Sequence, residues 1–564
     1  MKIAYRHFLL CILLLSGCLS TAFAKDHVVW RLGEKDGFCR EFALHDVAYS
    51  DFSKRYTCVT TICQIGTDDS RKIPCAFPGP KDVWAGKQSG ELLVRFGVGR
   101  IAPQTRARLV LDFVEVHPYS PPVLEITVNG FRTKVQTPAG KNSSYFQNRT
   151  TDSHDLAVSV ALPEGTLQVG ENRVSVRNDS GSWVVWDALT LTADAPVTAS
   201  KLRDKVELLG AKSSPALMYG EGQELLQPVR MQIANWGAAR EAEWGYDGRK
   251  GGKIRLERGL NQIEAGIPES FSGREVTVAV QAGNKPAGSV SVRLDTVDKW
   301  TIYLVQHTHT DIGYTKPQTE ILTEHLRYID YAVEYCEMTE RYPDDSKFRW
   351  TCETAWAVKE WLRIRPEEQV RKFMKYVRNG QIEVTAMFFN MSELSGENAY
   401  KAFLAPVGMF KRYGLPVSTA MQNDVNGVAW CLADYLPDLG VRYLTMGSNN
   451  HRALIPFEGP TVYKWESPSG KSLISYRSDH YNTGNHWGIE RGDMGVFSEG
   501  VFAYIDKLKR QQYPFDVVSV QYSGYFTDNS PPSAKECELI RAWNEKYAWP
   551  KCGAAAESRS PAVS

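Results

Sequence analysis

The sequence predicts a multidomain protein in which two N-terminal β-sandwiches precede an α/β domain with a mostly parallel, barrel-like sheet. The length of 564 residues corresponds to about three or four domains of ordinary size. Short alternating strands separated by turn residues fill the chain to about residue 298. From Trp300 onward, apolar strands alternate with long amphipathic helices, a pattern typical of βαβ units.

Residues 1–24 have the composition of an export signal. Two basic residues precede the apolar run 8–15, and Ala22-Phe-Ala24 fits a small-x-small cleavage site. Leu15-Ser-Gly-Cys18 also resembles a bacterial lipobox, in which Cys18 would carry a lipid anchor. Both outcomes predict export, either to a bacterial periplasm or to an outer membrane as an anchored lipoprotein.

Charge and cysteine content limit the partners and the compartment. Lys and Arg total 66 against 65 for Asp and Glu, so no overall field favours nucleic acid. The sequence does not predict an oligomeric state. Export permits disulfides, and Cys39, Cys58, Cys63 and Cys75 cluster in the first mature stretch. Their connectivity stays open, because four cysteines allow several pairings.

Residues 25–195 are predicted to form the first sandwich, with strands near 108–114, 123–128, 172–176 and 186–191. Trp30-Arg-Leu-Gly33 and Trp183-Val-Val-Trp186 resemble segments of the galactose-binding-like sandwich of rhamnogalacturonan lyases. The resemblance implies an accessory domain that either faces carbohydrate or is purely structural. Aromatic residues of this kind suit stacking on sugars, and they suit sandwich cores equally well.

Residues 196–298 are predicted to form a second, smaller sandwich. Its expected strands lie near 229–233, 253–256, 275–280 and 290–294, with glycine-rich turns between them. This stretch resembles an immunoglobulin or fibronectin-III-like spacer. It contains no residues with evident catalytic chemistry.

Residues 299–564 are predicted to form the α/β domain. We expect helices after Pro317, over 367–379, over 399–413 with a kink at Pro406, and through Trp430. Expected strands lie near 302–305, 381–387, 419–422, 442–446 and 517–520. Residues 552–564 have no apolar period, which predicts a disordered tail.

Polar side chains follow the predicted strands of this domain, at the edge where α/β folds place their chemistry. They are His307, His309, Asp311, Glu353, Glu393, Asn423, Asp424, Asn449, Asn450 and His451. Any one of them is explained by helix capping or by a loop position. Several at one sheet edge, however, predict a site. In His309-Thr-Asp311 an imidazole and a carboxylate lie on one side of an extended segment, close enough to share a divalent ion.

His307-Thr-His309-Thr-Asp311-Ile-Gly313 resembles the zinc motif of glycoside hydrolase family 38, the retaining α-mannosidases. The resemblance covers about residues 300–550 and implies that His309 and Asp311 bind zinc. Gln422-Asn-Asp424-Val-Asn-Gly427 is similar to the segment that carries the family nucleophile, which is also a zinc ligand. It implies both roles for Asp424.

Two departures mark a distant branch of that family. The residues after the nucleophile differ, since Val425, Asn426 and Val428 replace the proline, phenylalanine and histidine of the family. The nearest counterpart of the acid/base loop contains Asp528, with Asp479 as the first alternative.

The fourth zinc ligand of the family is a histidine well beyond this region. The resemblance therefore implies a domain incomplete at its C-terminus and weak in catalysis, unless His451, His480 or His486 completes the site.

The resemblance implies an exported, zinc-dependent retaining α-glycosidase that hydrolyses terminal sugars of glycans or plant polysaccharides. Zn²⁺ would bind through His309, Asp311 and Asp424, with Asp424 as nucleophile and Asp528 as acid/base. Two alternatives remain open. One is an inactive carbohydrate-binding surface protein. The other is a metal-dependent polysaccharide deacetylase, although no His-x-x-x-His pair, which would favour that chemistry, occurs among the 11 histidines.

Overall fold

The structure, a computed structural model, describes residues 27–47, 52, 60–82, 89–143, 145, 156–391, 393–449, 454–455, 457–525 and 528–557. The predicted export signal, Cys18, Cys58, Asn450 and His451 lie outside the described residues. The chain divides into two compact units, Met1–Arg203 and Asp204–Ser564. Within the part of the chain that the structure describes, no helix has the length and apolar character needed to cross a membrane.

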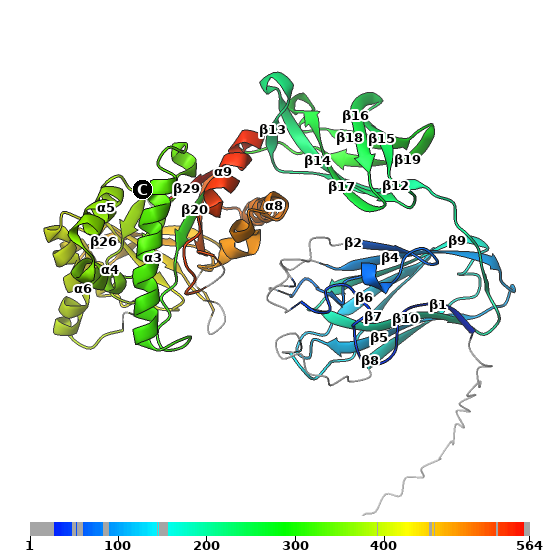
Figure 1. The fold of residues 1–564 in the computed structure, drawn as a ribbon, viewed down its shortest axis with the longest axis horizontal. Helices are drawn as coiled ribbons and strands as arrows, with labels where there is room; N and C mark the ends of the chain where they lie inside the picture. The colour runs from blue at the N-terminus through cyan, green and yellow to red at the C-terminus, as the bar shows by residue number, and fades with distance from the viewer. Residues whose placement is uncertain are drawn as a thin grey trace, which may run out of the picture. The chain divides into compact units, whose positions relative to one another are not determined.

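The first unit contains a β-sandwich of two sheets (Figure 1). One sheet orders β1 (His27–Gly33), β10 (Val184–Ala193), β5 (Ala107–Val116) and β8 (Leu156–Leu162), with β3 (Ala76–Phe77) beside β10. The other orders β11 (Thr198–Ala199), β4 (Glu91–Arg100), β9 (Gly170–Ser180), β6 (Val123–Val128) and β7 (Phe131–Gln136), with β2 (Thr60–Gln64) beside β4.

Alternating side chains of both sheets form one core in this sandwich. Leu109 and Leu111 of β5 and Leu92 and Val94 of β4 are fully buried in the same cluster. Trp186, one of the tryptophans behind the rhamnogalacturonan-lyase resemblance, is also fully buried there. Its indole therefore packs the core and is not available to stack on a sugar.

The second unit begins with a smaller sandwich. One sheet orders β12 (Val206–Ser213), β14 (Leu225–Asn235), β13 (Leu217–Tyr219) and β28 (Tyr547–Trp549), with β17 (Gly259–Pro268) beside β14. The other orders β16 (Arg249–Leu256), β15 (Arg240–Tyr246), β18 (Glu275–Ala282) and β19 (Lys285–Arg293). Apolar residues of β14 and β18 pack against each other in its core.

The α/β region contains two further sheets. The first orders β22 (Ile382–Val384), β21 (Trp350–Cys352), β20 (Thr301–His307) and β27 (Val517–Ser523), with β29 (Lys551–Ala554) also paired to β20. All of these pairs are parallel. The second orders β23 (Thr419–Asn423), β24 (Tyr443–Gly447), β26 (Ser472–Arg477) and β25 (Thr461–Glu466), and only β25 runs antiparallel.

A backbone hydrogen bond links these two sheets. The N–H of Ala386, just after β22, donates to the carbonyl of Thr419, the first residue of β23 (2.9 Å). The predicted mostly parallel arrangement is thus observed. Closure into a barrel stays a prediction, because the described strands form two sheets and not one closed ring.

Long helices connect these strands, as the sequence predicts. They are α3 (Gln318–Met338), α4 (Ala355–Ile364), α5 (Glu367–Arg378), α6 (Glu397–Arg412), α7 (Leu432–Asp438), α8 (Met494–Arg510) and α9 (Lys535–Lys546). Pro406 lies inside α6, and Gly380 follows α5 with a positive φ of 78°. One prediction is wrong: Trp430 precedes α7 in a turn, where its side chain is 58% exposed.

The predicted disorder from Cys552 onward is also wrong for the residues that the structure describes. Lys551–Ala554 form the strand β29, and Ala555, Ala556 and Glu557 are buried after it. The run of small residues has no amphipathic period because both faces of this strand are covered. Residues 558–564 lie outside the described residues.

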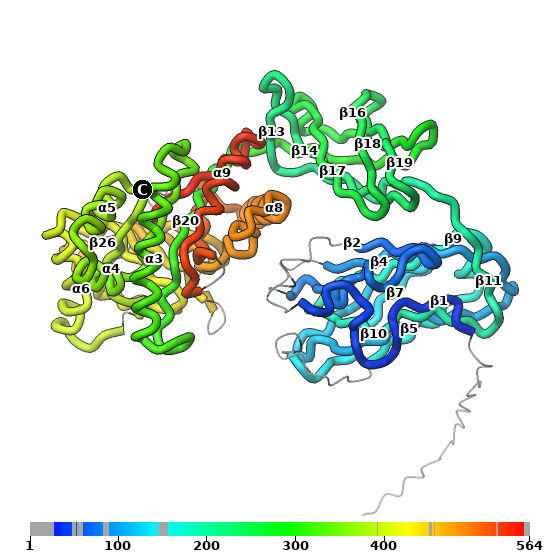
Figure 2. The backbone as a smooth tube through the Cα atoms, in the orientation of Figure 1, coloured from blue at the N-terminus to red at the C-terminus, as the bar shows by residue number. Residues whose placement is uncertain are grey.

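Residues close together near position 550 pair with strands of two different sheets. Trp549 of β28 pairs with Leu217 in the second sandwich, whereas Lys551 of β29 pairs with Thr301 in the α/β region. Figure 2 shows α9, in red, leading into this segment beside α8, in orange, and Trp543 of α9 contacts Phe497 of α8 (ring centroids 5.1 Å apart). The second sandwich is therefore joined to the α/β region by one continuous segment that contains β28 and β29.

Charged contacts reinforce this junction. Arg230 of β14 donates to Glu264 (3.2 Å), to the hydroxyl of Ser498 on α8 (2.6 Å) and to Glu499. Glu264 also accepts from Lys546 of α9 (2.6 Å), and the Arg230 side chain is only 16% exposed.

We expect Arg230→Ala to lower the free energy of unfolding of the second unit by about 2–3 kcal/mol, because it leaves a half-buried carboxylate short of its partner. Calorimetry should show the corresponding transition at a lower temperature. Lys212→Ala is the control, since Lys212 is 72% exposed and 3.9 Å from Glu499. Its removal should cost less than about 0.5 kcal/mol. Equal losses for both variants would contradict a specific role for Arg230.

Candidate active site

Several of the polar residues predicted at the strand ends, among the residues that the structure describes, meet at one edge of the α/β sheets. His307 ends β20, and its register partners on the neighbouring strands are Thr351 and Ser523. Glu353 follows β21, and Asp424 follows β23. Because these strands are parallel, their carboxyl ends bring residues far apart in sequence into one place.

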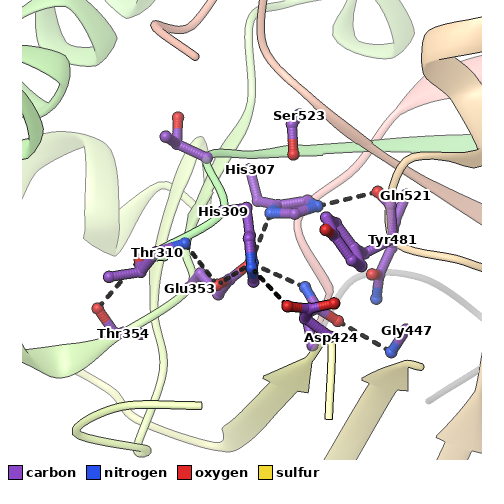
Figure 3. A network of polar contacts seen from close by, with 12 residues as sticks. His307, His309, Thr310, Glu353, Thr354, Asp424, Gly447, Tyr481, Gln521 and Ser523 are labelled. Atoms are coloured by element: carbon purple, nitrogen blue, oxygen red, sulfur yellow. Dashed lines mark hydrogen bonds and ion pairs between the residues drawn. The ribbon is translucent and has the colours of Figure 1, made fainter. Parts of the chain in front are cut away.

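A single buried carboxylate, that of Glu353, organises this edge (Figure 3). Its Oε1 accepts hydrogen bonds from His309 Nδ1 (2.9 Å), the Thr310 N–H (2.9 Å) and Asn390 Nδ2 (2.6 Å). Its Oε2 lies 2.8 Å from His307 Nδ1 and accepts from Asn423 Nδ2 (2.9 Å). Burial opposes ionisation, yet the two imidazoles outweigh it and hold the pKa of Glu353 well below its usual range.

The two histidines of the motif have different tasks. Both ring nitrogens of His307 face oxygen acceptors, because Nε2 lies 3.1 Å from the Tyr481 carbonyl and Nδ1 faces Glu353. His309 instead uses only Nδ1 on Glu353, so that its Nε2 points at Asp424 Oδ2, 3.6 Å away. His309 is thus the one of the pair whose Nε2 can bind a ligand once it gives up its proton.

Asparagine side chains connect Glu353 to the loop that carries Asp424. The Asn423 N–H donates to Asn390 Oδ1 (3.1 Å), and Asn423 Oδ1 accepts from the Gly447 N–H (2.9 Å). The Asp424 N–H donates to the Gly447 carbonyl (3.0 Å). The position of Asp424 is therefore set by hydrogen bonds that begin at Glu353.

Asp424 and His309 form a half-buried pair. Burial raises the pKa of Asp424, but hydrogen bonds from His309 and from Asn449 Nδ2 (2.6 Å) outweigh burial and lower it. For His309, burial disfavours the charged ring, whereas Glu353 and Asp424 favour it and raise its pKa to about 10. Asp424 is thus held ionised, as a nucleophile or a metal ligand must be.

Asp311 and Asp528 complete the group of carboxylates. Burial raises the pKa of Asp311, and the charges of Asp424 and Asp528 raise it further against the effect of His309. Asp528 Oδ1 accepts from the Tyr481 hydroxyl (2.8 Å) and from Asn482 Nδ2 (3.1 Å). The Asp528 carbonyl also accepts from the His309 N–H (3.2 Å). The structure therefore brings His309, Asp311, Asp424 and Asp528 into one neighbourhood.

The two candidate catalytic carboxylates share an unusual backbone. The φ angles are +67° at Asp424 and +45° at Asp528, in the left-handed region that few residues other than glycine adopt. Aspartate tolerates this region better than most side chains. Such positions collect at functional sites, where surrounding contacts fix them.

The structure separates the alternatives that the sequence left open. Asp479 accepts from Lys507 (2.6 Å), so this carboxylate is held in an ion pair, and Asp528 remains the better acid/base candidate. His480 Nδ1 accepts from the Asn482 N–H (3.0 Å), which puts the proton of the neutral ring on Nε2 and leaves no lone pair for a metal. The His480 ring stacks on Tyr481, which stacks on His309 (centroids 4.3 and 4.4 Å apart).

The donor set suits a divalent cation. Asp424 lies 3.6 Å from the Nε2 of His309, and a cation would offset the charges of Asp424 and Asp528, which together with burial raise the pKa of Asp311. The Glu353 contact to Nδ1 is the support that metal-binding histidines receive from carboxylates. Among the residues that the structure describes, no three His, Cys, Asp or Glu side chains already converge as a complete metal site. Of the predicted metal ligands, His309 and Asp424 approach each other to 3.6 Å.

Sequence reasoning placed Glu353 at a strand end without giving it a role. No motif identifies it, because its partners come from three other strands and their loops. The available signal was the polar end of an apolar segment, Phe348-Arg-Trp-Thr-Cys-Glu353, next to the strand that carries the histidines. Asn390 and Tyr481 gave no comparable signal.

Two regions of the chain match known protein families. Residues 299–558 match the family described as Glycosyl hydrolases family 38 N-terminal domain. Residues 28–191 match the CBM-like family described as Polysaccharide lyase family 4, domain III. Both resemblances read from the sequence are thereby confirmed. No curated protein matches the chain.

Solved structures give a weaker likeness. An α-mannosidase from Enterococcus faecalis is 14% identical, with a TM-score of 0.38, over 46% of this chain and 28% of that one. A protein of glycosyl hydrolase family 38, also from Enterococcus faecalis, is 13% identical, with a TM-score of 0.31, over 46% of this chain and 26% of that one. The chain thus spans under a third of the length of either protein.

We expect Glu353→Gln to lower the stability of the second unit by about 3 kcal/mol or more, because the buried histidines lose their counter-charge. Calorimetry at pH 6 measures this loss. Glu557→Gln is the matched control. Burial raises the pKa of Glu557 to about 8, so this fully buried carboxyl is already protonated at pH 6 and an amide mimics it. A Glu353→Gln variant as stable as this control would contradict the central role of the Glu353 charge.

Proposed function

We propose that residues 299–557 are the catalytic part of an exported, zinc-dependent retaining α-glycosidase of the α-mannosidase type. Its substrates would be terminal sugars of glycans or plant polysaccharides. The observation that carries the proposal is the pair His309 Nε2 and Asp424 Oδ2, 3.6 Å apart. This pair lies within a region that matches the N-terminal domain of glycosyl hydrolases family 38.

His309, Asp311 and Asp424 would hold the zinc ion. When bound, zinc would supply Lewis acidity toward two neighbouring sugar hydroxyls, orienting the ring and favouring its distortion toward an oxocarbenium-like transition state. Loading would displace the proton that the raised pKa of His309 otherwise retains. Glu353 keeps Nε2 aimed at the site by accepting from Nδ1.

Asp424 would attack the anomeric carbon and form the covalent glycosyl intermediate of a retaining enzyme. Its lowered pKa keeps it ionised, and the hydrogen bond from Asn449 orients it. Asp528 would protonate the leaving oxygen and later activate water. Tyr481 and Asn482 both donate to Asp528 Oδ1, which leaves Oδ2 as the oxygen for proton transfer.

A carbohydrate-binding protein without turnover is the second candidate. It is favoured by the incomplete convergence of metal donors among the described residues and by the CBM-like match of residues 28–191. Hydrolysis of an aryl α-glycoside panel by the zinc-loaded chain separates the two. Turnover above that of an Asp424→Ala control supports the glycosidase, whereas binding without turnover supports the second candidate.

We expect His309→Ala to lose both zinc and activity, because it removes the imidazole whose Nε2 lies 3.6 Å from Asp424. Equilibrium dialysis measures zinc content independently of turnover. His117→Ala, in the first sandwich, should keep both properties. Full zinc occupancy in His309→Ala would remove the proposed site.

We expect an activated fluoro-sugar to label Asp424, because a retaining enzyme forms a glycosyl-ester on its nucleophile. Mass spectrometry of the labelled peptide locates the adduct, and NMR of the first-formed product reports its anomeric configuration. An inverted first product would refute the assignment of Asp424.

We expect Asp528→Ala to slow substrates with poor leaving groups by about 10²–10⁴-fold and to spare those with very good ones. The reason is that only poor leaving groups need protonation. Kinetics on aryl α-glycosides of graded leaving-group pKa measure this difference. An equal loss across the series would move the acid/base role to another residue.

A further inference from the structure

Two buried cysteines of the first sandwich lie in contact. Cys39 is 8% exposed and Cys75 is 1% exposed. The Cys39 thiol forms a side-chain hydrogen bond with the Cys75 sulfur. The two residues are 36 positions apart in sequence, in the stretch where the pairing of four cysteines was open.

The backbone holds the two segments in register. The Ala43 N–H donates to the Ile73 carbonyl (2.8 Å), and the Cys75 N–H donates to the Ala43 carbonyl (2.7 Å). The Phe42 N–H closes the turn onto the Cys39 carbonyl (3.1 Å). These bonds hold the turn that begins at Cys39 against the segment that contains Cys75, and both side chains lie in the same buried cluster.

The same two segments form the walls of a surface hollow of about 460 Å³. One wall consists of residues 40–46, which directly follow Cys39, and the other of residues 69–71, shortly before Cys75. A covalent link between the cysteines would fix the separation of these walls.

We propose that Cys39 and Cys75 form a disulfide bond that joins the two walls of this hollow. The reaction is a thiol–disulfide exchange with a disulfide oxidant such as oxidised glutathione or an oxidised dithiol protein. The Cys39 thiolate attacks one sulfur of the oxidant and releases the other as a thiol. The Cys75 thiolate then attacks the Cys39 sulfur and displaces the remaining sulfur of the oxidant. Two S–H bonds are thereby replaced by one S–S bond, and the oxidant takes up two electrons and two protons.

The chemistry of the two sulfurs agrees with this pairing. In the folded chain, the hydrogen bond from Cys75 lowers the pKa of Cys39 despite burial, which shows that the two sulfurs interact there. Cys63 differs, because burial and nearby carboxylates raise its pKa to about 12. Since both paired sulfurs are buried in the folded chain, oxidation would occur during folding in an oxidising compartment.

Tryptic mapping tests the link directly, because the sequence separates the relevant cysteines. Cys39 falls on the tryptic peptide 36–40 and Cys75 on 73–81, whereas Cys58 and Cys63 share the peptide 56–71. The full chain is exported into the periplasm of a bacterial host, denatured in N-ethylmaleimide and digested without reductant. We expect 36–40 linked to 73–81. Recovery of both peptides with alkylated cysteines, or of 36–40 linked to 56–71, would overturn the proposal.

A thermal measurement gives a second readout. Reductant should lower the melting temperature of the first unit by about 5–10 °C in the wild-type chain. Cys39→Ser should abolish this response, and the double variant Cys39→Ser/Cys75→Ser should respond no differently from it. Cys63→Ser should retain the response. A reductant response that survives Cys39→Ser would refute the pairing.

Discussion

The ionised carboxylate of Glu353 is the group on which the rest of the α/β region depends. It is buried, and burying a charge is unfavourable unless donors surround it. Here the donors come from the ends of β20 and β23, from the loop after β20 and from Asn390 beyond β22. The charge therefore stabilises one arrangement of several strands at once, since any other register would leave it short of partners.

This arrangement explains why only one of the two histidines in the motif has a ring nitrogen directed at Asp424. Glu353 contacts both rings, but the other nitrogen of His307 faces the Tyr481 carbonyl, whereas that of His309 faces Asp424. The carboxylate of Glu353, which supports the fold, therefore also orients the His309 ring so that its Nε2 faces Asp424. The same hydrogen bonds stabilise the fold and orient the site. Substitutions of Glu353 must therefore be tested by measuring both the stability and the metal content of the variant.

The sequence sufficed where a local pattern decides the outcome. Apolar strands followed by polar residues predicted that His309, Asp311, Asp424 and Asp528 would lie near one another, because parallel strands bring their carboxyl ends together. The roles of these residues stay predictions. It failed where the outcome depends on which elements become neighbours. The role of Glu353 requires β21 to lie beside β20, and small residues from Cys552 onward become a strand only because β20 and α9 cover them. Trp430 is followed, but not preceded, by residues with the apolar period of a helix. It lies in the turn before α7 and not in the helix.

The division of the chain end between β28 and β29 has a consequence for biosynthesis. During translation, β20 emerges near the middle of the chain, yet two of its partners, β27 and β29, are made only after about 210 and 250 further residues. Until then the strand that carries the histidines has an unpaired edge, and such edges associate with other chains. A nascent chain in which β28 and β29 are not yet available would expose the edge of β20 that pairs with β29. It would also expose the edge of β13 that pairs with β28. Ribosome pausing between β27 and β29 is therefore more hazardous than pausing between the sandwiches, where completed sheets leave little to capture.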